Sequence, residues 1–471
     1  MTSRRVSRRE WLASSLAVAA AATGGCLDTA LVDENAGSID RPARTKVGTP
    51  LRLRVSGFEP RTVVTLECEA TDEAGRDYTG SWSLRTDESG AATLVNEDFT
   101  NNAPKSNWYG SERGRRIAER LTVSMILHRL SFESLFASSP NFFMGSRNSV
   151  TLSFHAHSGL FGTSTPSRSQ SRVLVDPGVS RRSVEANGLV GWLYEPATRG
   201  PHPGIVALHG ASASVPHRLS EMLATHGYAT LALQYFDAPG LPESLERIPL
   251  EYFDTAIRWL TGRPTVHDTG IGLFGISRGV EAALLTATGY DGPVAVIGYS
   301  GGGVVRHGVA GVPPTRYIDR PAWTRNGSPV ANPDAIRATF DAIEDHGRHD
   351  CRAALLPNAI RSRTPERLLE QALVPVEEID GPVLLFAGGD DQQWPSTAVA
   401  ALTVDRLRRR DHPRPFGLRT YCNSGHIFGV PYADYTGVPT NDTNGGSPKA
   451  NARAAADSWP TVLDYLENGL R

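Results

Sequence analysis

The sequence has few cysteines, very few lysines and no long hydrophobic run, and each shortage narrows the class of protein. Among 471 residues there are only four cysteines, widely spaced and without a Cys-x-x-Cys motif, which excludes a disulfide scaffold and the common zinc ribbons. Only three of the 48 basic residues are lysines, and with 50 acidic residues the formal net charge is −2. This balance gives no global field that would gather nucleic acid, so we expect no nucleic-acid partner. The sequence also lacks the His-Glu-x-x-His motif and the Gly-x-x-x-x-Gly-Lys phosphate loop, and we expect neither a metal nor a cofactor.

Residues 1–26 have the features of an export signal. The paired arginines Arg8 and Arg9 resemble a twin-arginine signal, and the apolar run Ala13–Ala22 that follows is far shorter than the roughly 20 residues of a membrane-spanning helix. Small residues directly before Cys26 resemble a lipoprotein cleavage site. We therefore expect export, lipid attachment at Cys26 and contact with a membrane only through that anchor. The alternative is a basic tail that is never cleaved, which would leave the protein in the cytoplasm.

Two regions of different periodicity follow a polar linker at residues 27–44. Over residues 45–178, short runs such as Val63–Cys68 alternate apolar and polar residues, and turn clusters such as Asp87–Gly90 separate them. Alternation with turns about ten residues apart is typical of antiparallel sheets, so we predict an all-β, immunoglobulin-like sandwich. No ionisable cluster in this region has the composition of a catalytic site.

Residues 179–471 alternate strands with helices instead. Apolar runs at Gly204–Leu208, Ala229–Gln234 and Ile271–Phe274 predict buried strands. The other expected elements are helices at Leu219–His226, Leu250–Leu260, Gly279–Thr288, Thr397–Arg410 and Ala450–Leu470, and strands at Val294–Ile297, Val383–Ala387 and Leu418–Tyr421. Such alternation predicts a mostly parallel sheet with helices on both faces. Residues 301–373 are weakly patterned, and we expect an insertion at the rim of the site.

The main chemical motif is Gly275-Ile276-Ser277-Arg278-Gly279, between the strand Ile271–Phe274 and a helix. Small residues two positions on either side let the chain turn sharply and present the serine hydroxyl at the helix N-terminus, as a nucleophile elbow requires. An alternative overlaps the motif, because Gly270–Gly275 fits the dinucleotide fingerprint and Asp291 lies where an acidic ribose ligand would stand. That fingerprint must follow a strand, whereas the residues before it are mostly polar. We therefore favour a nucleophilic serine, with a merely structural serine as a further alternative.

Two later loops carry candidates for an acid and a base. Asp390 and Asp391 follow the strand Val383–Ala387, where a carboxylate can orient a histidine. Asp391 is preferred because in many hydrolases of this fold the acid lies three residues after a glycine and a few before a proline, and Asp390 is expected to serve as a loop or capping carboxylate. His426 lies in a turn after the strand Leu418–Tyr421, where a histidine can take a proton from the serine and return it to a leaving group.

The order of these residues along the chain supports a catalytic triad. Ser277, then Asp391, then His426 is the serine, acid, histidine order of α/β-hydrolases. The backbone N–H groups of Arg278 and Ala211 would then form the oxyanion hole, since Ala211 follows the first strand of the predicted parallel sheet.

These motifs resemble the acyl-CoA thioesterase and bile acid-CoA:amino acid N-acyltransferase family. Further segments that carry the resemblance are Arg54–Pro60, Val64–Leu66, Pro203–Val206, Gly227–Leu233 and Glu251–Phe253. The resemblance covers about residues 45–471 and is weakest at 301–373. It implies an N-terminal β-sandwich, a C-terminal α/β-hydrolase domain, and an acyl-enzyme formed on Ser277, with His426 as base and then acid and Asp391 as its orienter.

The nucleophile bears on the expected reaction. Members of the family that transfer acyl groups to amino acids carry cysteine at this position, whereas this chain has Ser277, as the thioesterases do. The resemblance therefore implies hydrolysis of acyl thioesters, fatty acyl-CoA giving free acid and CoA. One alternative is an exported carboxylesterase acting on a non-CoA ester, because coenzyme A should be scarce outside the cell. Others are an acyl-CoA:amino acid N-acyltransferase and a surface binding protein whose hydrolase domain is inactive.

Three further features of the sequence have either an open role or an expected structural role. The arginines at 406 and 408–410 could meet nucleotide phosphates, but we expect a solvated helix end. His209 is expected to be a turn residue rather than a second base. The sequence leaves open whether Cys68, Cys351 and Cys422 stay reduced.

Overall fold

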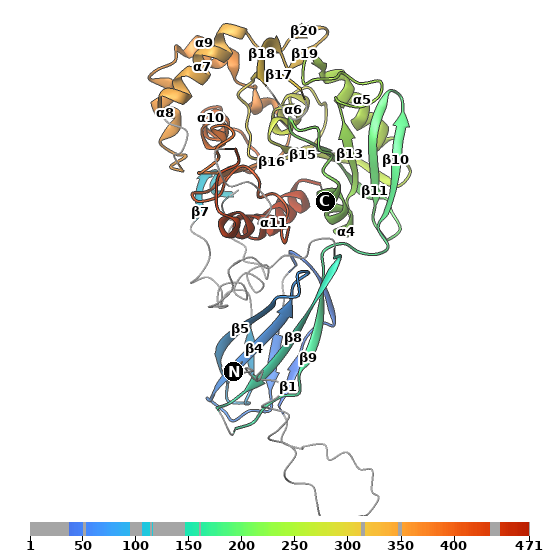
Figure 1. Cartoon of the computed structure of the whole chain (residues 1–471), viewed down its shortest axis with the longest axis vertical. Coiled ribbons are helices and arrows are strands. Elements are labelled where there is room, and N and C mark those ends of the chain that lie inside the picture. The colour runs from blue at the N-terminus through green and yellow to red at the C-terminus, as the bar shows by residue number, and fades with distance from the viewer. Residues whose placement is uncertain are drawn as a thin grey trace, which may run out of the picture. The chain divides into compact units, whose positions relative to one another are not determined.

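The computed structural model, drawn in Figure 1, describes residues 37–49, 53–94, 106–113, 115, 147–159, 162–311, 316–346, 351–433 and 443–470. The expected export signal, its Cys26 and the linker as far as residue 36 lie outside the described residues. Within the described ranges, no helix is both long and apolar enough to cross a membrane.

Two small sheets form the N-terminal β-rich region (Figure 1). The three-stranded sheet has the order β1 (Ser38–Asp40), β3 (Leu53–Ser56), β6 (Ala92–Leu94). The five-stranded sheet has the order β2 (Arg44–Lys46), β9 (Arg168–Val173), β8 (Ser149–His157), β4 (Val63–Thr71), β5 (Asp77–Arg85). The antiparallel strands predicted from alternation are present in this region.

The five-stranded sheet buries every second side chain of its long strands. In β4, Val64, Leu66 and Cys68 are buried, and in β5 so are Trp82 and Leu84. Their neighbours along each strand are exposed or half-buried, which is the period-two pattern of a sheet with one covered face. Side chains of the three-stranded sheet enter the same apolar cluster, so the two sheets share a core.

The linker prediction is wrong for its last part. Ser38–Asp40 forms β1, which pairs antiparallel with β3, and Ile39 is buried. Ile39 is the apolar residue of an otherwise polar stretch, and its burial against the core holds β1 in place. A strand of three residues is too short for alternation to be recognised in the sequence.

A nine-stranded sheet forms the centre of the α/β region. Its order is β10 (Ser180–Ala186), β11 (Leu189–Glu195), β13 (Ala229–Gln234), β12 (His202–Leu208), β15 (Val266–Ile276), β16 (Val294–Tyr299), β21 (Val383–Gly388), β22 (Phe416–Tyr421), β7 (Ser106–Gly110). The strands from β13 to β22 in this order are parallel. The predicted mostly parallel sheet is therefore confirmed.

Helices cover both faces of this sheet, as predicted (Figure 1). On one face lie α4 (His217–Thr225) and α11 (Pro448–Leu470), and on the other α5 (Leu250–Thr261), α6 (Arg278–Ala287) and α10 (Ser396–Arg409). Ile205 and Phe274 share an apolar cluster with α4 and α11, whereas Val206 and Leu273 share one with α5, α6 and α10. Neighbouring residues of each central strand thus face opposite helix layers.

The edges of the sheet differ from the sequence prediction. At one edge, β7 comes from within the range 45–178 assigned to the β-sandwich, yet it pairs antiparallel with β22. At the other, β10 and β11 form an unpredicted hairpin whose turn residues, Asn187 and Gly188, both have positive φ. Of these two additions, β7 pairs with a strand far away in the sequence, which local pattern does not report.

The insertion forms two small sheets and a group of short helices, which lie together in Figure 1. Its elements are β17 (His307–Ala310), β18 (Arg316–Pro321), β19 (Trp323–Arg325), β20 (Ser328–Pro329), α7 (Pro333–His346), α8 (Leu356–Arg361) and α9 (Glu366–Ala372), followed by the 3-10 turn η2 (Val376–Glu378). The short strand β14 (Ile248–Pro249), just before α5, pairs with β19. The insertion is therefore built onto the body of the α/β region.

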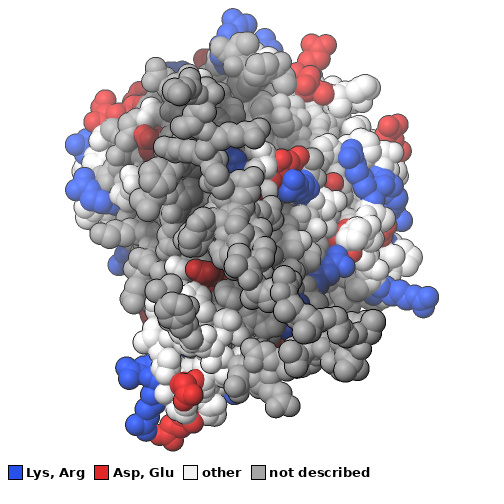
Figure 2. Space-filling model, turned by 60° about the horizontal axis from the view of Figure 1, so that its bottom comes forward, with Lys and Arg blue, Asp and Glu red and all other residues white. Residues whose placement is uncertain are grey.

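Acidic and basic side chains are interspersed on the face drawn in Figure 2, where the described charges lie in small groups of both signs. This distribution agrees with the small net charge of the chain.

Candidate active site

Ser277 occupies the turn between β15 and α6. Its backbone is strained, with φ 55° and ψ −120°, a combination that non-glycine residues rarely adopt. The flanking glycines are required by close packing, because a Cβ on Gly275 would collide with Gly279, and one on Gly279 would collide with the backbone of Leu208. The local geometry is thus that of the predicted elbow, in which the half-buried serine stands clear of the sheet.

The dinucleotide alternative is excluded by the same strand. Gly270–Gly275 lies wholly inside β15, hydrogen-bonded between β12 and β16. A fingerprint of this kind needs its glycines in a loop that cradles a pyrophosphate, and none of these glycines is in a loop.

The loop after β12 lies against Ser277. A Cβ on Gly210 would come within 3.0 Å of the Ser277 Cβ, so the glycine lets this backbone approach the nucleophile. Ala211 is the next residue of that loop, and Arg278 is the first residue of α6. Both residues expected to donate N–H groups to an oxyanion are therefore neighbours of Ser277.

Asp391 and His426 meet at the ends of β21 and β22. The His426 Nδ1 hydrogen bonds with Asp391 Oδ2 at 2.8 Å, and both side chains are buried, with 6% and 2% of their surface exposed. The other oxygen of Asp391 accepts the backbone N–H groups of Gln393 at 2.9 Å and Trp394 at 3.3 Å. Fixing the carboxylate on both oxygens also fixes the imidazole and leaves its Nε2 as the nitrogen that can exchange a proton.

Asp390 has a different task. Its carboxylate accepts the backbone N–H of Gly446 and the side-chain amide of Gln392, both at 2.9 Å. These contacts hold the loop that precedes α11 against the end of β21. The expectation that Asp391, and not Asp390, faces the histidine agrees with this geometry.

Two residues that the sequence analysis did not single out connect the serine and histidine loops. The Ser300 hydroxyl donates to the carbonyl of His426 at 2.6 Å, and the indole N–H of Trp394 donates to the carbonyl of Ser300 at 2.8 Å. The residue before Ser300, Tyr299, accepts the backbone N–H of Ser277 at 2.8 Å. A usable signal existed in the three glycines that follow Ser300, since such a run after a buried strand indicates close backbone approach.

His209 is held rigidly in the loop after β12, which agrees with the expectation of a structural turn residue. Its ring stacks on that of Tyr235 with centroids 4.1 Å apart, and Nδ1 donates to the carbonyl of Gly210 at 2.8 Å. Burial lowers the pKa of His209 to about 4, so the ring stays neutral at physiological pH. A neutral ring locked by stacking is suited to shaping the loop and not to exchanging protons with substrate.

A buried ion pair ties the elbow helix to the insertion. Arg278 Nε lies 3.0 Å from Glu281 Oε2, with both side chains almost fully buried. Arg278 also donates to the carbonyl of His307 at 2.8 Å, while Glu281 accepts the backbone N–H of Arg306 at 2.9 Å and the indole N–H of Trp323 at 2.6 Å. Burial raises the pKa of Glu281, and Arg278 opposes that shift. The pair thus fixes Arg306, His307 and Trp323 beside the helix that begins at the Ser277 turn.

A disulfide joins the insertion to the histidine loop, which answers part of the question about the cysteines. Cys351 and Cys422 are bonded, with Cα atoms 5.1 Å apart, and Gly389 makes room for them. Cys68 is a free buried thiol, and burial raises its pKa. Cys422 lies four residues before His426, so the bridge is part of the support of the candidate base.

The arginines near the end of α10 bind acidic residues of the insertion. Arg406 is buried and forms ion pairs with Glu370 at 2.8 Å and Glu377 at 2.6 Å, and Arg410 joins the same two carboxylates. Arg406 is therefore neither a solvated helix end nor open to a nucleotide phosphate, and both interpretations are wrong for it.

Within the described residues, no group of three or more His, Cys, Asp or Glu side chains is arranged to hold a metal ion.

Comparison with known proteins extends these observations. Residues 248–471 match the family model described as BAAT / Acyl-CoA thioester hydrolase C terminal. The C-terminal part of the chain is therefore similar to this family. Its matched range includes Ser277, Asp391 and His426 as well as the whole insertion.

Curated relatives of the family align along most of the chain. A mouse acyl-coenzyme A amino acid N-acyltransferase 1 is 26% identical, covering 92% of this chain and 97% of its own length. A rat acyl-coenzyme A thioesterase 1 is 26% identical over 92% and 96%, and a mouse peroxisomal succinyl-coenzyme A thioesterase is 25% identical over 91% and 95%. The resemblance inferred from motifs is therefore confirmed over nearly the full length.

Solved structures give more distant similarities. An acylaminoacyl peptidase from Pyrococcus horikoshii is 12% identical, covering 92% of this chain and 56% of its own, with a TM-score of 0.36. A puromycin-hydrolyzing peptidase from Mycobacterium tuberculosis is 14% identical over 88% and 54%, with a TM-score of 0.38.

Proposed function

We propose that this protein is a serine hydrolase that cleaves acyl thioesters of the acyl-CoA type through an acyl-serine intermediate. The observation that carries the proposal is the hydrogen bond between His426 and Asp391, on loops tied through Ser300 to the strained turn at Ser277. A nucleophile on an elbow, with a base oriented by a buried acid, is the arrangement of acyl-transfer enzymes.

The reaction runs in two halves. Ser277 Oγ attacks the acyl carbonyl carbon as His426 Nε2 takes the serine proton, and the backbone N–H groups of Arg278 and Ala211 stabilise the oxyanion. The C–S bond then breaks, and the proton on His426 passes to the leaving thiol. In the second half, water loses a proton to His426 and attacks the acyl-serine, which releases the carboxylic acid and restores the serine. Asp391 holds the imidazole in one orientation and stabilises its charged form throughout.

The relatives support the choice of substrate and also the rival reaction. Two of those named above are acyl-CoA thioesterases, and a third is an N-acyltransferase that would pass the acyl group to an amino acid. The serine at position 277 favours water as the acceptor in this chain. Product analysis in the presence of glycine or taurine separates the two reactions, because only a transferase forms the amide.

The test is a steady-state comparison of the purified protein and Ser277→Ala on acyl-CoA thioesters and matched oxygen esters. We expect turnover of the thioesters, with kcat lowered by about 10³-fold or more in Ser277→Ala. Labelling by a fluorophosphonate should likewise require Ser277. Turnover of oxygen esters alone would support the carboxylesterase alternative. No turnover of either substrate and no labelling would leave a binding protein with an inactive hydrolase domain.

The finer architecture and the location are part of the proposal. The two N-terminal sheets, which share an apolar core, are proposed to form an immunoglobulin-like sandwich.

Export with a lipid on Cys26 is proposed from the N-terminal signal, and the disulfide Cys351–Cys422 supports it because structural disulfides persist in oxidising compartments. Mass spectrometry of the mature N-terminus, with Cys26→Ser as the control, tests the anchor: a lipid-modified Cys26 is expected, and an uncleaved Met1 would overturn it.

A further inference from the structure

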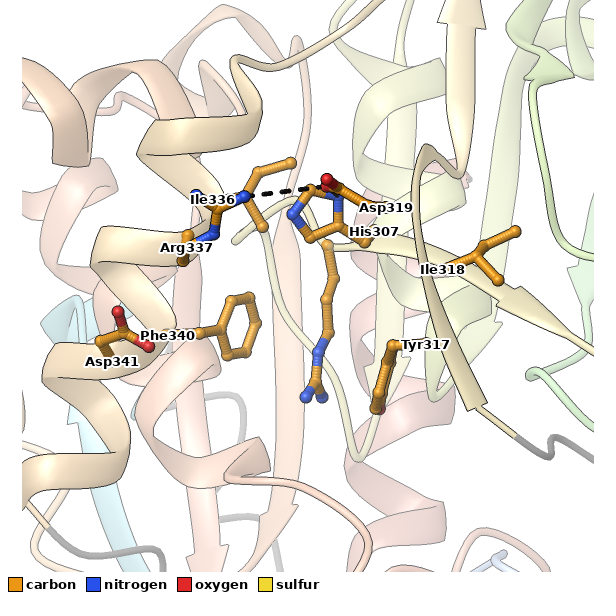
Figure 3. Close-up of a pocket in the computed structure, with 9 residues that line it drawn as sticks. His307, Tyr317, Ile318, Asp319, Ile336, Arg337, Phe340 and Asp341 are labelled. Carbon is orange, nitrogen blue, oxygen red and sulfur yellow. Dashed lines mark ion pairs between the residues drawn. The ribbon is translucent and has the colours of Figure 1, made fainter.

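A pocket of about 370 Å³ lies in the insertion, between β17, β18 and α7 (Figure 3). Its wall combines the apolar side chains of Ile318 and Ile336 with the rings of Tyr317 and Phe340, which face each other across it. Neither the family resemblance nor the triad gives this pocket a task. Its contents therefore have to be inferred from its own chemistry.

Arg306 places a positive charge between these two rings. Its Cζ lies 3.9 Å from the centroid of Tyr317 and 4.4 Å from that of Phe340, so the guanidinium is stacked on both faces. Stacking leaves only the edge of the guanidinium, with its N–H groups, to bind a ligand. Nη1 is buried, and among the described residues it has no hydrogen-bond partner. A buried donor of a charged group without a partner is costly, and because Arg306 lines the pocket, its guanidinium is a group there that attracts an anion.

The nearby acids offset this charge only in part: Glu281 and Glu344 act on Arg306 electrostatically, and Asp341 is a further, exposed acid of the pocket lining. Glu281 is engaged by Arg278 and by the Trp323 indole. Asp319 lies at the rim, 75% exposed, where it is 3.9 Å from Arg337 and 3.8 Å from His307 (Figure 3). Arg306 is half-buried, whereas the acids Asp319 and Asp341 of the lining are exposed, and a cation set behind exposed acids suits an incoming anion.

The cation is also close to the candidate catalytic residues. Arg306 Cζ lies 5.8 Å from the ring of Trp394, whose backbone N–H is bonded to Asp391. From the other side, the backbone N–H of Arg306 binds Glu281, the partner of Arg278. Arg306 is thus connected to Asp391 through Trp394, and to Arg278 of α6 through Glu281.

We propose that Arg306 binds an anionic group of the substrate, in the first instance a carboxylate at the far end of an acyl chain. The apolar walls suit the methylene groups of such a chain, and the guanidinium fork suits a carboxylate. A phosphate of the thiol carrier offers the same chemistry from the other end of the substrate. The inference rests on the proposed thioesterase function, and Arg306 is a specificity residue within it.

The test uses four substrates: glutaryl and pentanoyl groups, each on coenzyme A and on N-acetylcysteamine, which lacks phosphate. Wild type is compared with Arg306→Gln, Arg306→Lys and the control Arg181→Gln. Arg181 also stacks on a ring, 4.0 Å from Trp192, but it lies on β10 outside the pocket. For Arg306→Gln we expect KM for both glutaryl thioesters to rise about tenfold or more, with kcat within about threefold and the pentanoyl thioesters unchanged. Arg306→Lys should retain part of the preference.

The four substrates distinguish a carboxylate ligand from a phosphate ligand. A KM effect that follows coenzyme A whatever the acyl group supports a phosphate ligand, and an effect that follows glutaryl on either thiol supports the carboxylate. Equal loss on all four substrates, or no change on any, overturns the proposal. A second readout does not need turnover: glutarate should bind wild type in calorimetry and lose at least about tenfold in affinity with Arg306→Gln. If wild type hydrolyses none of the thioesters yet binds glutarate through Arg306, the thioesterase function fails and the anion site stands.

Discussion

The loops that follow β12, β15, β21 and β22 differ from the insertion between β16 and β21 in how their residues reach the site. Each loop delivers its group within a few residues of a buried strand, so the register of the sheet sets the position of Ser277, Asp391 and His426. In the insertion, Arg306 is held between two aromatic rings and beside a buried ion pair, and these groups come from segments far apart in sequence. The candidate triad is thus specified locally, and the proposed anion site is specified by packing.

The sharpest test of local specification compares two adjacent carboxylates. Asp391→Asn should lower kcat by about 10³- to 10⁴-fold, because an amide cannot stabilise the charged imidazole and favours the wrong tautomer. Asp390→Asn removes contacts only to Gly446 and Gln392, and we expect less than about a tenfold effect. Steady-state kinetics of both variants on one thioester measures the difference.

Equal losses in the two variants would break the comparison, since the position within the loop would then not matter. Unfolding midpoints should be recorded alongside, because a loss of activity that tracks instability in Asp390→Asn reports on the loop and not on catalysis.

The attachment of the insertion to the elbow helix is tested at Glu281. Glu281→Gln leaves the buried charge of Arg278 without its counter-ion, and we expect the free energy of unfolding to fall by about 3–5 kcal/mol. Urea unfolding measures this change. Glu246→Gln, which removes the half-buried partner of the exposed Arg320, serves as the control and should leave the midpoint nearly unchanged. A silent Glu281→Gln would mean that the insertion is held by its apolar contacts alone.

The disulfide links the two regions covalently. Cys351 and Cys422 close a loop of 71 residues, so Cys422→Ser should lower the free energy of unfolding by about 2–4 kcal/mol. Reductant should produce a similar decrease in wild type and none in the variant, with Cys68→Ser retaining the response of wild type. Identical unfolding of wild type with and without reductant would contradict the bridge.

The smallest expected effect concerns acid stability at His209. Its folded pKa of about 4 is below the unfolded value of about 6.5, so the unfolded chain binds a proton first as pH falls. Stability from this residue is full above pH 6.5 and is lost between pH 6.5 and 4, by about 2 kcal/mol at pH 5. His209→Gln should show a correspondingly flatter dependence of unfolding free energy on pH. A slope equal to that of wild type would mean that the buried ring is not the source.

Regular elements of the α/β region were predictable because burial on both faces leaves unbroken apolar runs. Ala229–Gln234 is a strand with the predicted bounds, and the helix expected at Leu250–Leu260 ends one residue later, at Thr261. The hairpin of β10 and β11 was missed although Asn187–Gly188 is a typical two-residue turn, because β10 is mostly exposed and has no apolar alternation. The strand β7 could not be assigned locally, since its partner β22 lies some 300 residues away.

The candidate site divides in the same way. Glycine spacing and chain order were enough to propose the serine, acid and histidine. Arg306 matches no motif, and Ser300 is indicated only by the glycines that follow it. The significance of both depends on which carbonyl or ring lies opposite after folding. The disulfide was likewise undecidable, because the spacing of Cys351 and Cys422 says nothing of the loop geometry that brings them together.

The exposed edge strand β10 bears on whether another copy of the chain can add a strand to the nine-stranded sheet. A long parallel sheet would end in a row of unpaired N–H and C=O groups, open to strand addition by another chain. Here the last strand is β10, which carries Arg181 and Arg182 and has most of its side chains in solvent. Charge along the edge of a sheet discourages a second chain from extending it. We therefore expect the nine-stranded sheet to resist addition of another chain at β10.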